Sequence, residues 1–315
     1  MLVLVHAVAL SMAAAPSFDS FVTHVEGRWT GASYTWTPTE AAGSMPLGVA
    51  PGYVTTPKPS KTVASPVMRS CGGAVQGVEE ARETLSQAAG TVMLNRQADG
   101  TTFLTYGSWA QAPAALSAPD AEETDMMCSL DAFGISVSIA HADRSRRRLL
   151  VVVADGELAC CDVAIEGHDD TEGSTDVADT LLSGRMQCIV EAKAWEGGAS
   201  TLRLDGKPPA GQPWINARTQ WASSESSIEG GAPLVPTAAE GEDAGRIAYL
   251  PGGCWLRIAK AWTTAGGDGY PIPVPGIELE VGSLAVEAGE VKTISHAFSA
   301  AGELSRVRFS KVVSV

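Results

Sequence analysis

The chain has 315 residues, of which 45% are hydrophobic and 18% are charged. This composition is typical of a globular protein and excludes a disordered one. The net charge of -14 argues against nucleic-acid binding, because that function depends on clustered Lys and Arg that neutralise phosphates.

The N-terminal segment predicts a targeting leader. Residues 1–15 are apolar and end in small side chains, although they lack a basic start. A buried first strand and a truncated targeting segment are the alternatives. The segment is too short to span a bilayer comfortably, and no other stretch is long and apolar enough to do so. We therefore expect a removed leader and a mature chain without a transmembrane segment.

The next segment predicts a short helix followed by a strand. Apolar residues between positions 18 and 25 have the spacing of one helical face. Gly27-Arg28-Trp29 follows, and aromatic residues then alternate through Tyr34 and Trp36. Such alternation is typical of a strand with one buried face.

The middle of the first half predicts less regular structure. Residues 41–70 are rich in Pro, Gly, Thr and Ser, which indicates a long loop. Apolar positions from Val78 to Ala88 lie at helical spacing and predict a short helix. The pair Asp99-Gly100 predicts a hairpin between residues 91–94 and residues 101–109.

The first half ends in a predicted antiparallel meander. Ile135–Ile139 alternates with a period of two, and the apolar run Leu149–Val153 follows it. A turn at Asp155-Gly156 then leads into the strand Leu158–Ile165.

Two charged segments are expected to lie in solvent. The run Arg144-Ser-Arg-Arg-Arg148 is interpreted as a hairpin turn with solvated arginines, in preference to an anion site. Residues 167–182 begin acidic and Gly/Ser-rich and are interpreted as a linker that includes His168. A calcium loop is the alternative there, but the ligand spacing of an EF-hand is missing.

The second half predicts eight short strands with turns between them, at residues 186–195, 200–204, 216–221, 245–250, 254–261, 277–286, 291–298 and 304–313. Such a series is typical of an up-and-down barrel or a sandwich. A barrel is the simpler prediction, because closure removes exposed strand edges.

The two halves also share motifs. Asp155–Glu166 returns as Ala301–Val312, and in both copies Gly-Glu-Leu opens a strand. Glu26–Trp36 has a fainter echo in Ser183–Trp195, which places Met186 at the position of Trp29. The predicted fold is therefore all-β: two tandem antiparallel barrels with a few short helices, formed by residues 16–166 and 183–315.

Three motifs carry a resemblance to a known family. Gly27-Arg28-Trp29, the run from Arg148 to Leu158, and Tyr249–Trp255 are similar to motifs of a tandem lipocalin-like (calycin) family of cyanobacteria and plastids. That family is distantly related to the S- and T-type phycobiliprotein chromophore lyases. The resemblance implies that Trp29 closes one end of a barrel under a short helical lid. It also implies a photosynthetic setting, with residues 1–15 as a plastid leader; secretion is the alternative.

The sequence assigns no catalytic residue and no metal ligands. It contains no phosphate loop, HExxH or GxSxG motif. The six cysteines form no C-x-x-C pair and have no His at zinc spacing. Whether the protein is an enzyme is left open, and a chromophore lyase-like activity is the enzymatic alternative.

Tryptophan and arginine supply the candidate ligand-binding residues. Eight Trp residues are present, and each can belong to a packed core or to the lining of a cavity for a planar ligand. Arginines are the candidate partners of a ligand carboxylate, because their fork pairs with it through two hydrogen bonds. The candidate binding residues are Trp29, Trp36, Trp109, Arg148, Trp221, Trp255, Arg306 and Arg308.

These residues predict a non-catalytic binding protein for an apolar or tetrapyrrole-like ligand. A lipid is the other candidate ligand. The sequence implies no cofactor besides these possible ligands. The alternative function is a structural or assembly subunit of a larger photosynthetic complex.

Overall fold

The computed structural model describes residues 18–39, 48–70, 74–84, 87–95, 101–113, 132–154, 156–169, 195–203, 220–228, 245–265, 272–285, 289–299 and 302–314. Strands form almost all of this described part, and one α-helix, α1 (Phe18–Val25), precedes them. The predicted all-β class is confirmed. No helix among these residues is both long and apolar enough to cross a membrane.

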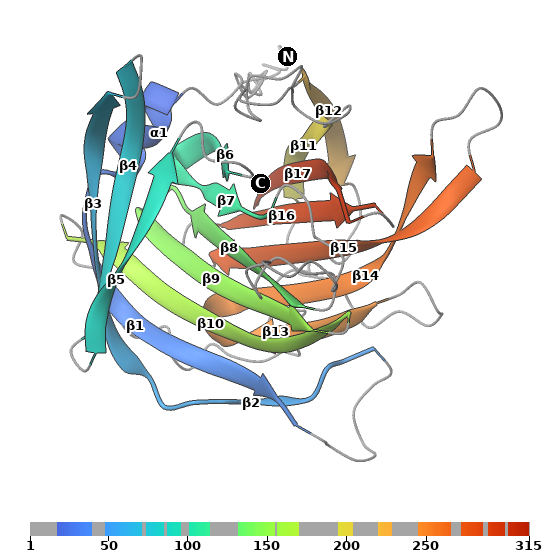
Figure 1. Cartoon of the computed structure of the whole chain (residues 1–315), viewed down its shortest axis with the longest axis horizontal. Helices are drawn as coiled ribbons and strands as arrows, with labels where there is room; N and C mark the ends of the chain where they lie inside the picture. Colours follow the sequence, from blue (N-terminus) through green and yellow to red (C-terminus); the bar gives the residue numbers. More distant parts are fainter. Residues whose placement is uncertain are drawn as a thin grey trace, which may run out of the picture.

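The strands form two antiparallel sheets (Figure 1). Sheet A has the order β5-β4-β3-β1-β10-β9-β8-β7-β6, with β2 paired to β1. Its strands are β1 (Gly27–Pro38), β2 (Gly52–Val54), β3 (Lys58–Ser70), β4 (Ala74–Thr84), β5 (Gln87–Asn95), β6 (Thr101–Phe103), β7 (Trp109–Gln111), β8 (Ala132–Ala140), β9 (Ser145–Ala154) and β10 (Glu157–His168).

Sheet B has the order β12-β11-β17-β16-β15-β14-β13. Its strands are β11 (Trp195–Arg203), β12 (Gln220–Ile228), β13 (Arg246–Leu250), β14 (Cys254–Ala265), β15 (Ile272–Ala285), β16 (Glu290–Phe298) and β17 (Leu304–Ser314). Sheet A curls strongly (Figure 1), but within the described residues no ladder joins its edge strands β5 and β6. The described edges of sheet B, β12 and β13, are likewise not paired with each other.

The internal repeat is confirmed by strand order and register. The series β3-β1-β10-β9-β8-β7-β6 in sheet A matches β12-β11-β17-β16-β15-β14-β13 in sheet B. The matching hairpins β9–β10 and β16–β17 both turn at a glycine of positive φ, Gly156 and Gly302. Each hairpin has a register shift just after its turn. The two Gly-Glu-Leu motifs therefore occupy equivalent turns.

The register also corrects the proposed match of the opening motifs. His168 and Ser314 lie equally far beyond their turn glycines, and they pair with Trp29 and Trp195 respectively. Trp195, rather than Met186, is therefore the equivalent of Trp29. The sequence comparison missed this match because no Gly-x-Trp precedes β11.

Several local predictions were wrong. The helix expected from Val78 to Ala88 is replaced by β4 and β5, and part of the loop expected at 41–70 forms β2 and β3. The hairpin expected around Asp99-Gly100 does not pair its flanking segments, because β5 and β6 lie at opposite edges of sheet A. The domain boundaries stay predictions, and the leader at 1–15 lies outside the described residues.

The two sheets share one hydrophobic core. Alternating apolar residues of β8, β9 and β10 pack against apolar residues of β14 to β17 in a single buried cluster. The rings of Phe133 and Phe298 meet across it, 5.3 Å apart. Burial of this apolar area stabilises the two units as one body, so their polar faces point away from each other.

Candidate functional site

The face of sheet A opposite the shared core is polar. Side chains alternate across a strand, so the register identifies the residues on this face. We call it the concave face; it includes Trp29, Ser33, Thr35, Ser60, Thr62, Glu80, Ser136, Ser138, Arg146, Arg148, Asp162, Glu166 and His168. The polar residues line the inside of the curl, and the apolar ones face sheet B.

One end of the concave face is closed by α1. Phe21 and Val25 of this helix pack with Ala64 of β3 and with Phe103 and Trp109 of β6 and β7. The helix thus spans two parts of the sheet that are distant along its strand order. The resemblance implied a short helix over Trp29, and α1 lies there, although the described strands of sheet A do not close into a barrel.

Trp29 lies beneath the lid and is buried. Its indole Nε1 donates a hydrogen bond to the carbonyl oxygen of Val25, 3.0 Å away. The Arg146 guanidinium lies 4.2 Å from the centre of the indole ring, and the His168 ring meets its edge. His168 is buried and bonded to the Glu26 carbonyl, so the interpretation that it belongs to a solvated linker was wrong.

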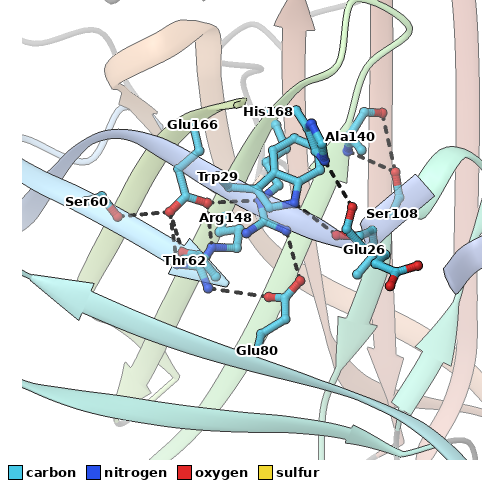
Figure 2. A network of polar contacts seen from close by, with 12 residues as sticks. Glu26, Trp29, Ser60, Thr62, Glu80, Ser108, Ala140, Arg148, Glu166 and His168 are labelled. Carbon is cyan, nitrogen blue, oxygen red and sulfur yellow. Dashed lines mark hydrogen bonds and ion pairs between the residues drawn. The ribbon is translucent and has the colours of Figure 1, made fainter. Parts of the chain in front are cut away.

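Next to Trp29 lies a layer of buried ion pairs (Figure 2). Arg146 donates from Nε to Glu166 Oε2 at 2.9 Å and from Nη1 to Glu80 Oε1 at 2.8 Å. Arg148 donates from Nε to the same Glu166 oxygen at 2.9 Å, and its Nη1 lies 3.5 Å from Glu80 Oε2. Two arginines therefore share two carboxylates, and the formal charges of the layer cancel.

Two hydroxyl groups complete the coordination of Glu166. Ser60 and Thr62 donate to its Oε1 at 2.9 and 2.7 Å, and Thr62 in turn accepts from Arg148 at 2.8 Å. Burial alone would raise the pKa of Glu166, but the charges of Arg148 and Arg146 and these hydrogen bonds lower it to about 2. Glu166 is therefore ionised at neutral pH.

This layer overturns the expectation of solvated arginines at Arg144–Arg148. Arg146, Arg147 and Arg148 are all buried. Arg147 points to the other face, where its Nε donates to the Gly252 carbonyl of the second unit at 3.0 Å. Arg148 was predicted to bind a ligand carboxylate. Its guanidinium is instead already bound to Glu166, Glu80 and Thr62, so it is not available for that role.

The residues beyond the ion-pair layer are partly exposed. Thr35, Asp162, Leu150 and Ser136 lie side by side across β1, β10, β9 and β8. Thr35 donates to Asp162 Oδ1 at 2.6 Å, and Leu150 is 39% exposed. Within the described residues, Asp162 Oδ2 accepts no hydrogen bond. A carboxylate oxygen, hydroxyls and an apolar side chain thus form a mixed surface at the open end.

The other predicted tryptophans do not converge on this surface. Trp36 lies in the shared core, and Trp109 lies in the small cluster beneath α1. Trp255 is buried in sheet B, where its Nε1 donates to Glu280 at 3.3 Å. Trp221 belongs to β12, but its side chain is outside the described part.

The predicted arginines of the last strand lie on sheet B. Side chains alternate along β17, and Val307 and Phe309 belong to the shared core. Arg306 and Arg308 therefore point away from that core. Arg306 forms an ion pair with Glu278 at 3.2 Å, and Arg308 is exposed. They share this face with Trp255, Arg257, Glu278, Glu280 and Ser295, and we call it the far face of sheet B.

Sequence reasoning missed the acidic partners in this site. Glu80 lay in the segment predicted as a helix, and Glu166 was placed at the end of a strand without a role. The period-two spacing of Arg146 and Arg148 within a strand was a usable signal, because it predicts two cations on one face. Among the described residues, no group of His, Cys, Asp and Glu is arranged to hold a metal ion.

One solved structure has a similar fold. A protein of unknown function of the DUF3598 family from Nostoc punctiforme matches with a TM-score of 0.57 and 16% identity, over 95% of this chain and 100% of that one. The chain has the fold of this DUF3598 protein. A tesB protein from Mycobacterium avium subsp. paratuberculosis aligns over 92% of this chain and 79% of its own, with a TM-score of 0.14 and 7% identity, too low to carry an argument. No family model and no curated protein matches the sequence.

Proposed function

We propose that the chain is a non-catalytic binding protein that holds a small ligand at the open end of the concave face of sheet A. The arrangement of this face carries the proposal: α1, Trp29 and the neutral ion-pair layer close one end, while Thr35, Asp162, Leu150 and Ser136 stay partly exposed at the other. Small-molecule sites are concave, and a few placed polar groups beside apolar contacts fix the orientation of the ligand. The fold shared with a cyanobacterial protein supports the lipocalin-like relation.

The chemistry of the open end favours a tetrapyrrole-like ligand over a fatty acid. Because Arg148 is already paired with Glu166 and Glu80, it offers nothing to a fatty-acid carboxylate. Asp162 instead offers a carboxylate oxygen, which pairs with an N–H donor such as a pyrrole nitrogen. Leu150 supplies an apolar contact for a planar ring. A plastid or other photosynthetic setting is part of this proposal.

Tryptophan fluorescence of the full chain, titrated with biliverdin, protoporphyrin and palmitate, tests the proposal. We expect saturable quenching by a tetrapyrrole, weakened roughly tenfold or more in Asp162→Asn, because a hydrogen bond to a charged group contributes about 1.5–3 kcal/mol. Asp169→Asn is the matched control, since that carboxylate pairs with Arg28 at the surface.

A flat response to all three compounds would contradict ligand binding at this face. It would favour the structural or assembly alternative, which the shared core and the packed lid also suit. Co-purification with a larger complex would then be the next measurement. Transfer of a bilin to an apo-acceptor would be needed to support the lyase alternative.

A further inference from the structure

Equivalent positions of the two units carry opposite charges. Asp162 and Arg308 lie equally far beyond Gly156 and Gly302, and both point away from the shared core. Each faces a hydroxyl residue on a neighbouring strand: Thr35 opposite Asp162, and Ser295 opposite Arg308. The repeat has therefore preserved the position and reversed the charge.

The far face of sheet B has an excess of positive charge. Arg257 pairs with Glu280 and Arg306 pairs with Glu278, both at 3.2 Å. No described carboxylate forms an ion pair with Arg308. Among the side chains that the structure describes on this face, three arginines thus face two glutamates, in a chain whose net charge is -14. A local cation on an acidic protein attracts small anions.

Hydrogen-bond donors remain available around this charge. The Nε atoms of Arg257 and Arg306 are buried and have no hydrogen-bond partner among the described residues, although the guanidinium ends of both residues are paired. Buried donors normally have a partner, so part of the hydrogen-bonding capacity of Arg257 and Arg306 is unused, and a ligand reaches these residues only through the exposed atoms of their side chains. Arg308 adds a planar fork of donors that matches a carboxylate.

We propose that the far face of sheet B binds a small organic dicarboxylate through Arg308 and Arg306. The two residues lie on the same face two positions apart, roughly 7 Å along the strand. One carboxylate pairs with Arg308, and the second reaches Arg306 beside Glu278, because the Arg306 side chain is 41% exposed, unlike the buried and fully paired Arg148. This site is separate from the concave face of sheet A, where the equivalent position is the acidic Asp162, so the same anion is repelled there.

Calorimetric titration of the full chain with succinate at low salt tests this site, with neutral succinamide as the matched compound. We expect saturable succinate binding, no succinamide binding, and a loss of affinity of tenfold or more in Arg308→Gln. Arg308→Lys keeps part of the affinity, because the charge remains but the fork is lost. Arg28→Gln is the control: Arg28 is also an exposed arginine, but it lies on β1 beside Asp169.

Two outcomes would overturn the proposal: no saturable succinate binding, or unchanged affinity in Arg308→Gln. Arg308 is exposed, so its replacement leaves the fold intact. Asp162→Asn separates this site from the proposed function of sheet A. It is expected to leave succinate binding unchanged while it weakens the binding of a tetrapyrrole.

Discussion

His141, in the turn between β8 and β9, lies with its Nδ1 3.3 Å from Oε2 of Glu290, the first residue of β16. This contact joins the two units of the repeat. Burial lowers the pKa of His141 to about 4, so its ring is neutral at pH 7. Since an ionised carboxylate only accepts hydrogen bonds, Nδ1 donates to Glu290 and Nε2 accepts from Ser283 at 2.9 Å.

Glu290 also receives hydrogen bonds and charge from three other groups. The amide of Ala142 donates to Oε2 at 3.1 Å, and Lys292 Nζ lies 3.1 Å from the same oxygen. Lys311 Nζ lies 2.7 Å from Oε1. Although burial opposes it, the His141 hydrogen bond and the two lysines hold the pKa of Glu290 below its usual range. The units are therefore joined by a charged cluster as well as by the apolar core.

Replacement of Glu290 by Gln should destabilise the protein by about 3–5 kcal/mol, because Lys292 stays buried without its counter-charge. The free energy of unfolding in urea measures the effect. Glu157→Gln is the control: its pair with Arg246 also joins the units, but both side chains are more than half exposed. That change should cost less than about 1 kcal/mol. Equal effects of the two substitutions would contradict the role of burial.

Glu166 should make the stability of the protein depend on pH in the acidic range. Its folded pKa of about 2 lies below the ordinary value of 4.5, so its contribution is complete above pH 4.5. It is lost as the pH falls from 4.5 towards 2. Glu166→Gln should therefore cost about 3–5 kcal/mol at pH 7 and progressively less below pH 4.5. Unfolding free energies of both proteins between pH 2 and pH 7 measure this, and a constant difference would contradict it.

The last five strands of the second half, β13 to β17, were predictable because local signals agreed. Runs near β13 to β17 alternate with a period of two and end in glycine turns such as Gly252-Gly253 and Gly302. The segment at β4 and β5 was not predictable in this way. Val78 and Ala81 satisfy a helical period, and the decisive interaction is the ladder with β3 and β5, which residue spacing does not reveal.

The ion-pair layer shows a similar limit. Arg146 meets Glu80 from a position 66 residues away in the sequence. Glu166 is a neighbour only through the β9–β10 ladder. The helical lid over Trp29 was implied by the family resemblance, because Trp29 and the α1 helix are adjacent in the chain and carry the motif on which that resemblance rests. The partners of Arg146 were not, because burial of a charge depends on tertiary contacts.

Gly282 should not tolerate a side chain, because the Trp255 indole covers it. A Cβ at this position would lie 1.9 Å from Trp255 Cζ2. Gly282→Ala should therefore displace the indole from Glu280, shift the tryptophan emission and cost about 1–3 kcal/mol. Gly156→Ala is the control, because no described atom beyond its chain neighbours would lie within 4 Å of an added Cβ and only its positive φ is strained. An unchanged emission spectrum in Gly282→Ala would contradict the contact.

His296 and His141 should respond in opposite ways to replacement by Leu. Both are buried, and burial lowers the pKa of each to about 4. Within the part of the chain that the structure describes, the two ring nitrogens of His296 have no hydrogen-bond partner, and its register neighbours Leu279 and Val307 belong to the apolar core. An unpartnered buried polar group costs about 1–3 kcal/mol, so His296→Leu should stabilise the protein by a similar amount.

His141→Leu should instead destabilise the protein, because Glu290 and Ser283 lose their partner. The sign of the pH effect follows from the lowered pKa. The unfolded state binds a proton near pH 6.5 and the folded state near pH 4, so stability is lost as the pH falls between these values. His296→Leu should remove the part of this acid-induced loss of stability that His296 causes. Urea unfolding at pH 7 and pH 5 measures both effects, and destabilisation by His296→Leu at pH 7 would show that its ring nitrogens do have partners.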